Sequence, residues 1–140
     1  MSRVADVMST YVEFIDADAT VKEAAELMGE LEVGALPAGG PDRLEGVVTD
    51  RDILYRVVAA GLDPTAVRVR DVLSRPVVSC TRDDSLQAAM DLMAAHHIRR
   101  MPVLDAQGRA VGWVTLADVA RVLLVGSEAL QESLRGLTEA

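Results

Sequence analysis

The sequence predicts an α/β (α+β) fold in which a strand-helix-strand-strand-helix unit is built twice, the two units being related by a pseudo-two-fold axis. The first observation is a repeat: "VADVMS" at 4–9 matches "VRDVLS" at 69–74, and "DATVKEAAELM" at 18–28 matches "DDSLQAAMDLM" at 83–93. Both matches share one offset, which is the signature of a duplicated structural unit. The second observation is composition: 50% of the residues are hydrophobic and 3% are aromatic, which favours helices packed on a sheet.

Each repeat is expected to begin with a strand and a helix. The segments "YVEFI" at 11–15 and "VVSCT" at 77–81 are rich in residues that favour strands. Apolar residues then recur at the spacing of one helical face: Val21, Ala24, Ala25 and Met28 in the first repeat, and Leu86, Ala89, Met90 and Met93 in the second. Thr20 and Ser85 stand at N-cap positions, and Glu23 is placed to complete a capping box with Thr20.

Two further strands and a second helix complete each repeat. The second strands are expected around 33–36 and 98–104, followed by turns at "GGPDR" and "DAQGR". The third strands contain "LEGVV" and "AVGWVT" and lead into helices at 52–60 and 118–125, for which Gly61 and Gly126 are the expected stops.

These boundaries give three segments. Residues 1–65 hold the first repeat with its lead-in and linker, 66–125 hold the second repeat, and 126–140 form a helical tail. Leu130, Leu134 and Leu137 lie on one face of that tail, as in a docking or dimer helix. Neither repeat could bury much surface alone, so we expect the two to pack as one body.

Composition excludes several classes of protein. The formal net charge of -8 argues against nucleic-acid binding, which needs a basic surface, and against an anionic membrane. No apolar run approaches the ~18 residues of a membrane span, and the N-terminus has no signal core. Cys80 is the single cysteine, which fits a reducing cytosol. No familiar catalytic motif occurs, so we expect a cytoplasmic protein that is not an enzyme.

One motif occurs in both repeats. "GVVTDRDI" at 46–53 and "GWVTLADV" at 112–119 share Gly-x-Val-Thr-x-x-Asp. The motif can be purely structural, because a threonine N-cap with an acid three residues on stabilises a helix start by ~1 kcal/mol. It can also be half of a ligand site, because a strand end followed by a helix start offers amides, a hydroxyl and a carboxylate at one spot.

The order of elements, the "DVM/DVL" lead-in and the Gly-x-Val-Thr-x-x-Asp motif resemble a tandem CBS-domain pair, or Bateman module, over nearly the whole chain. The stretch "GVVTDRDILYRVVAAGLDP" also resembles the small stand-alone CBS-pair proteins of bacteria, including the hypoxic response proteins of actinobacteria. The resemblance implies binding of an adenosine-containing ligand such as AMP, ADP, ATP or S-adenosylmethionine between the halves, and pairing into flat dimers. It also implies that Asp52 and Asp118 hold the ribose, with Thr49 and Thr115 nearby.

The resemblance further implies that the two sites differ. "HHIRRMPV" at 96–103 aligns with "LEVGALPA" at 31–38, and basic residues at this place in nucleotide-binding relatives reach the phosphates of the other half's site. Arg99 and Arg100 are therefore expected to work with Thr49 and Asp52, whereas the site of Asp118 lacks such charges. The alternative for these arginines is a solvated strand edge.

A metal site is not expected. His96, His97 and Cys80 carry ligand chemistry, but adjacent histidines on a strand would point to opposite faces, so that at most one could join a given site.

The sequence thus favours a regulatory module that senses an adenosine-containing ligand and acts on an unknown partner protein. The alternative is a ligand-free structural or interaction module in which both motifs are only caps. We also expect a symmetric homodimer, because the helices display more apolar surface than one small sheet can cover. The residues concerned are Leu27, Leu31, Ile53, Val57, Leu92, Val119 and Leu123.

Overall fold

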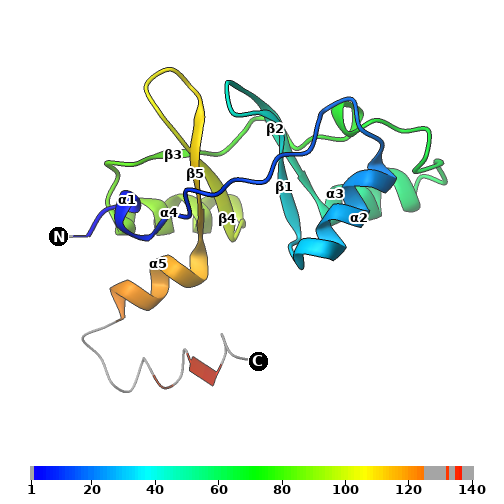
Figure 1. Cartoon of the computed structure of the whole chain (residues 1–140). Helices are drawn as coiled ribbons and strands as arrows, with labels where there is room; N and C mark the ends of the chain where they lie inside the picture. Colours follow the sequence, from blue (N-terminus) through cyan, green and yellow to red (C-terminus); the bar gives the residue numbers. More distant parts are fainter. Residues whose placement is uncertain (1, 125–131, 133–134, 137–140) are drawn as a thin grey trace. The chain divides into compact units, whose positions relative to one another are not determined.

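The computed structural model describes residues 2–124, 132, 135 and 136 of the 140-residue chain. These residues form two compact units, whose helices and strands are labelled in Figure 1. The first-repeat unit comprises Val12–Val77 and Ala106–Ala110. The second-repeat unit comprises the described residues of Met1–Tyr11, Val78–Asp105 and Val111–Ala140.

The first-repeat unit combines two α-helices, a β-hairpin and two short helical turns. Its elements are α2 (Val21–Leu31), β1 (Ala35–Gly40), β2 (Arg43–Thr49), α3 (Asp50–Ile53), the π-helical turn η1 (Leu54–Val58) and the 3₁₀ turn η2 (Val69–Asp71). β1 and β2 pair antiparallel with a bulge at Gly39. Only glycine suits that position, because its φ is 115° and a Cβ would lie 2.4 Å from the carbonyl oxygen of Arg43. The buried core includes Val21, Met28, Leu36, Val48 and Val57.

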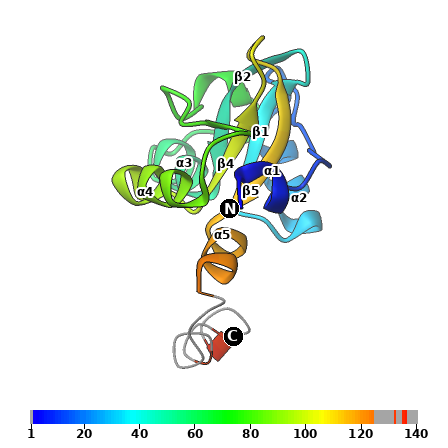
Figure 2. The ribbon, with the colours of Figure 1, turned by 90° about the vertical axis from the view of Figure 1, so that its left-hand side faces the viewer.

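The second-repeat unit is built on a three-stranded sheet in the order β3-β4-β5. Its elements are α1 (Val4–Val7), β3 (Cys80–Thr81), α4 (Leu86–His96), β4 (Arg100–Leu104), β5 (Ala110–Thr115) and α5 (Leu116–Leu123). β3 runs parallel to β4, and α5 leaves directly from the end of β5, as the turned view in Figure 2 shows. The buried core includes Val4, Leu86, Met93, Met101, Val114 and Val119.

The two repeats use the same local devices. The Thr20 hydroxyl accepts a hydrogen bond from the Glu23 N–H, and the Ser85 hydroxyl accepts one from the Ala88 N–H, which confirms both N-caps. The helices end in the same way: the C-cap residues Glu32 and His97 have φ of 56° and 55°, in the left-handed region. The repeat seen in the sequence is therefore a structural repeat.

The lead-in segments are exchanged between the units. The lead-in of the first repeat (4–9) pairs with β5, since the N–H and carbonyl of Ser9 bond the carbonyl and N–H of Trp113 at 2.8 and 2.9 Å. The lead-in of the second repeat (69–74) joins the first-repeat unit, where the Ser74 N–H donates to the Val47 carbonyl at 2.9 Å. The compact units are thus assembled from non-contiguous parts of the chain.

The opening strand of each repeat is shorter than predicted. In "VVSCT" only Cys80–Thr81 forms a strand, and in "YVEFI" only Ile15 pairs, as an isolated bridge to Ala38. These segments connect the exchanged lead-ins to the repeats, so most of their residues find no neighbouring strand despite their composition. The second strands also begin later than predicted, at Ala35 and Arg100.

The predicted helices need three corrections. Met90 is only partly buried and Ala25 is exposed, so the buried face is narrower than predicted. The second helices begin earlier, at Asp50 and Leu116, because the preceding threonine is the N-cap. Only the Thr20 half of the capping box with Glu23 is formed.

Two expectations fall on residues that are not described. The proposed tail helix with Leu130, Leu134 and Leu137, and the stop at Gly126, lie outside the described residues. Among the helices that are described, none combines the length and apolar character required to cross a membrane.

Candidate functional site

The Gly-x-Val-Thr-x-x-Asp motif lies in each unit where the last strand runs into a helix. The glycine of each motif lies where a lead-in segment (69–74 at Gly46, 4–9 at Gly112) packs across the strand. A Cβ on Gly46 would lie 3.0 Å from Leu73 Cδ1, and a Cβ on Gly112 would lie 2.7 Å from Met8 Sδ. The valine of the motif is fully buried in both copies. Packing alone therefore accounts for the glycine and the valine, and the question of function concerns the threonine and the aspartate.

At the first junction, Thr49 and Asp52 form a complete capping box. The Thr49 hydroxyl accepts a hydrogen bond from the Asp52 N–H at 3.0 Å, and the Thr49 N–H donates to Asp52 Oδ2 at 2.9 Å. Two amides at the start of α3 are thereby satisfied, so the capping role predicted for this motif is confirmed here.

The Asp52 carboxylate has further partners within the first-repeat unit. The residue is only 8% exposed, and Ser74 Oγ lies 2.7 Å from its Oδ2 and 3.0 Å from its Oδ1. The guanidinium of Arg56 lies 3.9 Å from Oδ1 and donates to the carbonyl oxygens of Leu73 at 3.1 Å and Val72 at 3.4 Å. Asp52 is thus a buried carboxylate at the start of α3 that is hydrogen-bonded to the second lead-in through Ser74.

At the second junction, Thr115 and Asp118 have a more open arrangement. The Thr115 hydroxyl accepts from the Asp118 N–H at 3.2 Å and lies 2.8 Å from Asp118 Oδ2, to which it can donate. Arg121 contacts Asp118 Oδ1 at 3.1 Å. The Asp118 side chain is 43% exposed, compared with 9% for Asp52. Among the described residues no serine contacts this carboxylate.

The two carboxylates therefore differ in the hydrogen bonds that they can still accept. A carboxylate has about four lone-pair positions. Asp52 meets an amide, a hydroxyl that spans both oxygens, and a guanidinium, and it is shielded from solvent. Asp118 meets one hydroxyl and one guanidinium and faces solvent, so its carboxylate can accept bonds from an additional donor.

Arg99 and Arg100 belong to the second-repeat unit. The Arg99 carbonyl accepts a hydrogen bond from the Leu116 N–H at 2.7 Å, which brings the backbone before β4 beside the start of α5. Arg99 is exposed and Arg100 is partly buried, and neither side chain bonds another described residue. The structure thus places Arg99, Arg100, Thr115 and Asp118 in one unit, and Thr49 and Asp52 in the other.

At the corresponding position of the first-repeat unit, the nearest charged side chain has the opposite sign. There the Gly34 carbonyl accepts from the Asp50 N–H at 2.9 Å. A Cβ on Gly34 would lie 3.0 Å from Asp50 Oδ2, so a carboxylate covers the position that an arginine holds in the other repeat. An anionic ligand would meet repulsion at this point and attraction at Arg99.

The residues considered for metal binding are not arranged as expected. His96 ends α4 and His97 is its C-cap, so these histidines are not on a strand. Cys80 is buried with its thiol 3.9 Å from the Pro102 carbonyl oxygen. Burial, with a smaller contribution from the charge of Asp84, raises the pKa of this thiol to about 12. Within the described part of the chain, no three His, Cys, Asp or Glu side chains cluster as a metal site would require.

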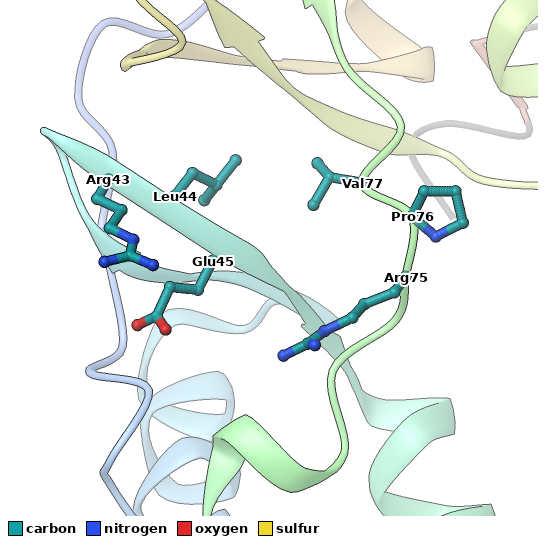
Figure 3. Close-up of a pocket in the computed structure, with 6 residues that line it drawn as sticks. All are labelled: Arg43, Leu44, Glu45, Arg75, Pro76 and Val77. Carbon is teal, nitrogen blue, oxygen red and sulfur yellow. The ribbon is translucent and has the colours of Figure 1, made fainter.

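A shallow pocket lies elsewhere on the first-repeat unit. It has a volume of about 350 Å³ and is lined by Arg43, Leu44, Glu45, Arg75, Pro76 and Val77, which Figure 3 shows as sticks. None of the six residues predicted for the ligand site contributes to this lining. Glu45 is engaged with Arg70, so the free charge around the pocket comes mainly from Arg43 and Arg75.

Two residues at the first junction escaped the sequence analysis. Arg56 stands four residues after Asp52, the spacing at which helical side chains of opposite charge meet, so its contact could have been proposed. Ser74 ends a lead-in whose counterpart also ends in serine, at Ser9. Its contact with Asp52 could not have been proposed, because the exchange of lead-ins is visible only in three dimensions.

Comparison with known proteins gives a consistent result. The family described as CBS domain matches residues 4–59 and 69–125. The CBS domain-containing protein YhcV of Bacillus subtilis is 43% identical over 120 residues, covering 86% of this chain and 84% of that protein. Hypoxic response protein 1 of Mycobacterium tuberculosis is 38% identical over 124 residues, covering 88% of this chain and 86% of that protein.

Solved structures share the fold. A crystal structure of Hypoxic Response Protein I with two coordinated zinc ions has a TM-score of 0.78 at 37% identity, covering 87% of this chain and 99% of that one. The CBS domain pair of MJ0100, in complex with 5′-methylthioadenosine and S-adenosyl-L-methionine, has a TM-score of 0.78 at 23% identity. The match covers 90% of this chain and 98% of that one. The second likeness concerns the fold alone. The resemblance inferred from the sequence is confirmed.

Proposed function

The chain belongs to the CBS-domain family, and we propose that it is a regulatory module that binds an adenosine-containing ligand, with AMP, ADP, ATP and S-adenosylmethionine as candidates. The observation that carries the proposal is the Asp118 carboxylate. It lies half exposed where β5 meets α5, and two of its possible acceptor positions are unoccupied by described residues. A carboxylate in this state can accept the paired hydroxyls of a ribose.

The neighbouring residues suit the remainder of such a ligand. Arg99 and Arg100 are cationic, unpaired with described residues, and in the same unit as Asp118. A charge-assisted hydrogen bond from one arginine to a phosphate contributes about 1.5–3 kcal/mol. Thr115 holds the helix start in place through the Asp118 N–H. We therefore assign the ribose to Asp118 and the phosphates to the two arginines.

This assignment differs from the ranking that the sequence favours. The resemblance predicts that Arg99 and Arg100 bind the phosphates of a ligand held by Thr49 and Asp52. We now propose the opposite ranking, because the Asp52 carboxylate is buried and both of its oxygens are contacted by the Ser74 hydroxyl of the same unit. The contribution of Thr49 and Asp52 to ligand binding is accordingly proposed to be small.

A second candidate function has one observation in its favour. The capping box at Thr49 and Asp52 explains that copy of the motif without any ligand. If the same held for Thr115 and Asp118, the chain would be a ligand-free interaction module that acts through an apolar surface. Leu54, Tyr55 and Val58 provide such a surface on η1.

A ligand screen separates the two functions. A ligand that binds only the folded state raises stability by about 2.7 kcal/mol when its concentration is a hundred times its dissociation constant. We expect thermal shift with AMP, ADP, ATP, NAD or S-adenosylmethionine to reveal at least one stabilising ligand, and Asp118→Asn to lose that stabilisation. No shift with any of the five, confirmed by calorimetric titration, would leave the interaction module as the function.

The proposal extends to assembly and location. We propose that the chain forms a homodimer and that ligand binding changes how this dimer interacts with a partner protein. In this proposal the protein catalyses no reaction. We also propose a cytoplasmic location, because the single cysteine of the chain fits a reducing compartment.

A further inference from the structure

The two lead-in segments bring equivalent serines beside the two motifs. Ser74 bonds Val47, and Ser9 bonds Trp113. Val47 and Trp113 each stand two residues before the motif threonine of their strand. The same backbone contact therefore places a serine next to each motif, within its own unit.

The hydroxyls of these serines have different partners. Ser74 Oγ lies 2.7 and 3.0 Å from the two oxygens of Asp52. Ser9 Oγ instead donates to the carbonyl oxygen of Tyr11 at 3.1 Å. One motif carboxylate is thus covered by its lead-in serine, and the other, Asp118, is not.

We infer that Ser74 determines which of the two motif carboxylates binds the ligand, an inference that rests on the proposed function. Ser74 Oγ lies within hydrogen-bond distance of both Asp52 oxygens, which is where the hydroxyls of a ribose would have to donate. Because Ser74 belongs to the same chain and its N–H is bonded to the Val47 carbonyl, its hydroxyl competes intramolecularly for the carboxylate. A ligand can reach both Asp52 oxygens only by displacing the Ser74 hydroxyl, whereas Asp118, although contacted by Thr115 and Arg121, is not covered by a lead-in serine in the described part of the chain.

Arg56 also helps to hold Ser74 against the Asp52 carboxylate. It donates to the carbonyl oxygens of Leu73 and Val72, which immediately precede Ser74, and it also contacts Asp52. Displacing Ser74 would disturb these bonds as well. Two hydrogen bonds from Arg56 therefore hold the backbone of Val72 and Leu73 in place, and this backbone positions Ser74 against the Asp52 carboxylate.

Calorimetric titration with AMP tests the inference in the full chain. Wild type is expected to bind one AMP per chain, and Ser74→Ala to gain a second, weaker binding event at the uncovered Asp52. Ser74→Thr keeps a hydroxyl and should restore the behaviour of wild type. Ser9→Ala is the matched control at the equivalent position, and it should leave the stoichiometry unchanged. Adding Asp52→Asn to Ser74→Ala should abolish the second event.

The outcomes separate the inference from the proposed function. Binding by Ser74→Ala with the stoichiometry and affinity of wild type would overturn the selection by Ser74 while leaving the proposed function intact. The single variant Asp52→Asn shows whether the wild-type binding event uses the Asp52 carboxylate, even if Ser74→Ala fails to fold. Unchanged binding by Asp52→Asn agrees with the inference, and loss of the wild-type event overturns it. No heat from AMP, ADP, ATP or S-adenosylmethionine in any variant would overturn the proposed function itself.

Discussion

Gly46 and Leu73 meet so closely that a Cβ atom on Gly46 would lie 3.0 Å from Leu73 Cδ1 and 3.2 Å from Leu73 Cβ. Leu73 is buried, and its carbonyl is bonded by Arg56, so its side chain and backbone have little room to move. We expect Gly46→Ala to lower the free energy of unfolding by about 1–3 kcal/mol through overpacking. Urea denaturation followed by circular dichroism measures the change.

Gly29 supplies the control for this substitution. It lies within α2, where a Cβ would meet nothing within 4 Å. Gly29→Ala should therefore raise the free energy of unfolding by roughly 0.5–1 kcal/mol through helix propensity. Equal effects of the two substitutions would contradict the close packing of the lead-in on β2.

The two motif aspartates should differ in their contribution to stability. Asp52→Ala leaves the Thr49 N–H and the Ser74 hydroxyl without their acceptor in a buried place, and we expect a loss of about 2–3 kcal/mol. Asp118→Ala removes a half-exposed carboxylate that is well screened by solvent, and we expect a loss of only ~0.5 kcal/mol. Denaturation of both variants under the same conditions checks the ranking. Similar losses would mean that Asp118 is also held mainly as a cap.

The parts of the fold that the sequence predicts correctly rest on local patterns. The N-caps at Thr20 and Ser85 and the buried faces around Met28 and Met93 depend on residues within one or two helical turns. The interacting residues are therefore close together in the sequence, where their spacing can be recognised. The same holds for the cap at Thr49, whose partner stands three residues away.

The errors arise where partners are distant in the chain. The segment around Ile15 has strand composition but forms only one bridge, because its neighbours are set by the exchange of lead-ins. The contact between Ser74 and Asp52 is likewise missing from the sequence prediction, because no local pattern places Ser74 against that carboxylate. The apolar surface predicted for the homodimer includes Val57 and Val119, but both are fully buried. Helical spacing alone does not say which of two apolar faces meets the core.

The Cys80 thiol should make stability depend on pH in the alkaline range. Burial raises the pKa of this thiol from its ordinary value of 9.0 to about 12. As the pH rises, the unfolded chain therefore loses this proton before the folded chain does. The stabilising contribution is complete below pH 9.0 and is lost progressively as the pH approaches about 12. Urea midpoints of wild type and Cys80→Ala should accordingly converge between about pH 8 and about pH 10. A constant difference would contradict the burial of the thiol.

An apolar surface on η1 supports the expected homodimer. Leu54 is 51% exposed and Tyr55 and Val58 are each 63% exposed, within the five residues of η1. A cluster of this kind on a folded protein is typical of an interface. We expect light scattering at micromolar concentration to give the mass of a dimer. Val58→Glu should convert it to a monomer by placing a charge in the interface.

Ala25 provides the control for that experiment. It is exposed on α2, outside the η1 surface, so Ala25→Glu adds the same charge without touching the proposed interface. This variant should keep the mass of wild type. A monomeric wild type, or dissociation of both variants alike, would show that η1 is not the interface.

The last prediction concerns the charge that binds the phosphate. Arg100→Ala should remove a charge-assisted bond of about 1.5–3 kcal/mol and so weaken AMP binding roughly tenfold to a hundredfold. Arg43→Ala is the matched control, because Arg43 lines the pocket on the first-repeat unit and is absent from the proposed site. It should leave the affinity unchanged in calorimetric titration. If Arg43→Ala weakens binding while Arg100→Ala does not, the phosphate binds at that pocket, and the assignment to Arg99, Arg100 and Asp118 is wrong.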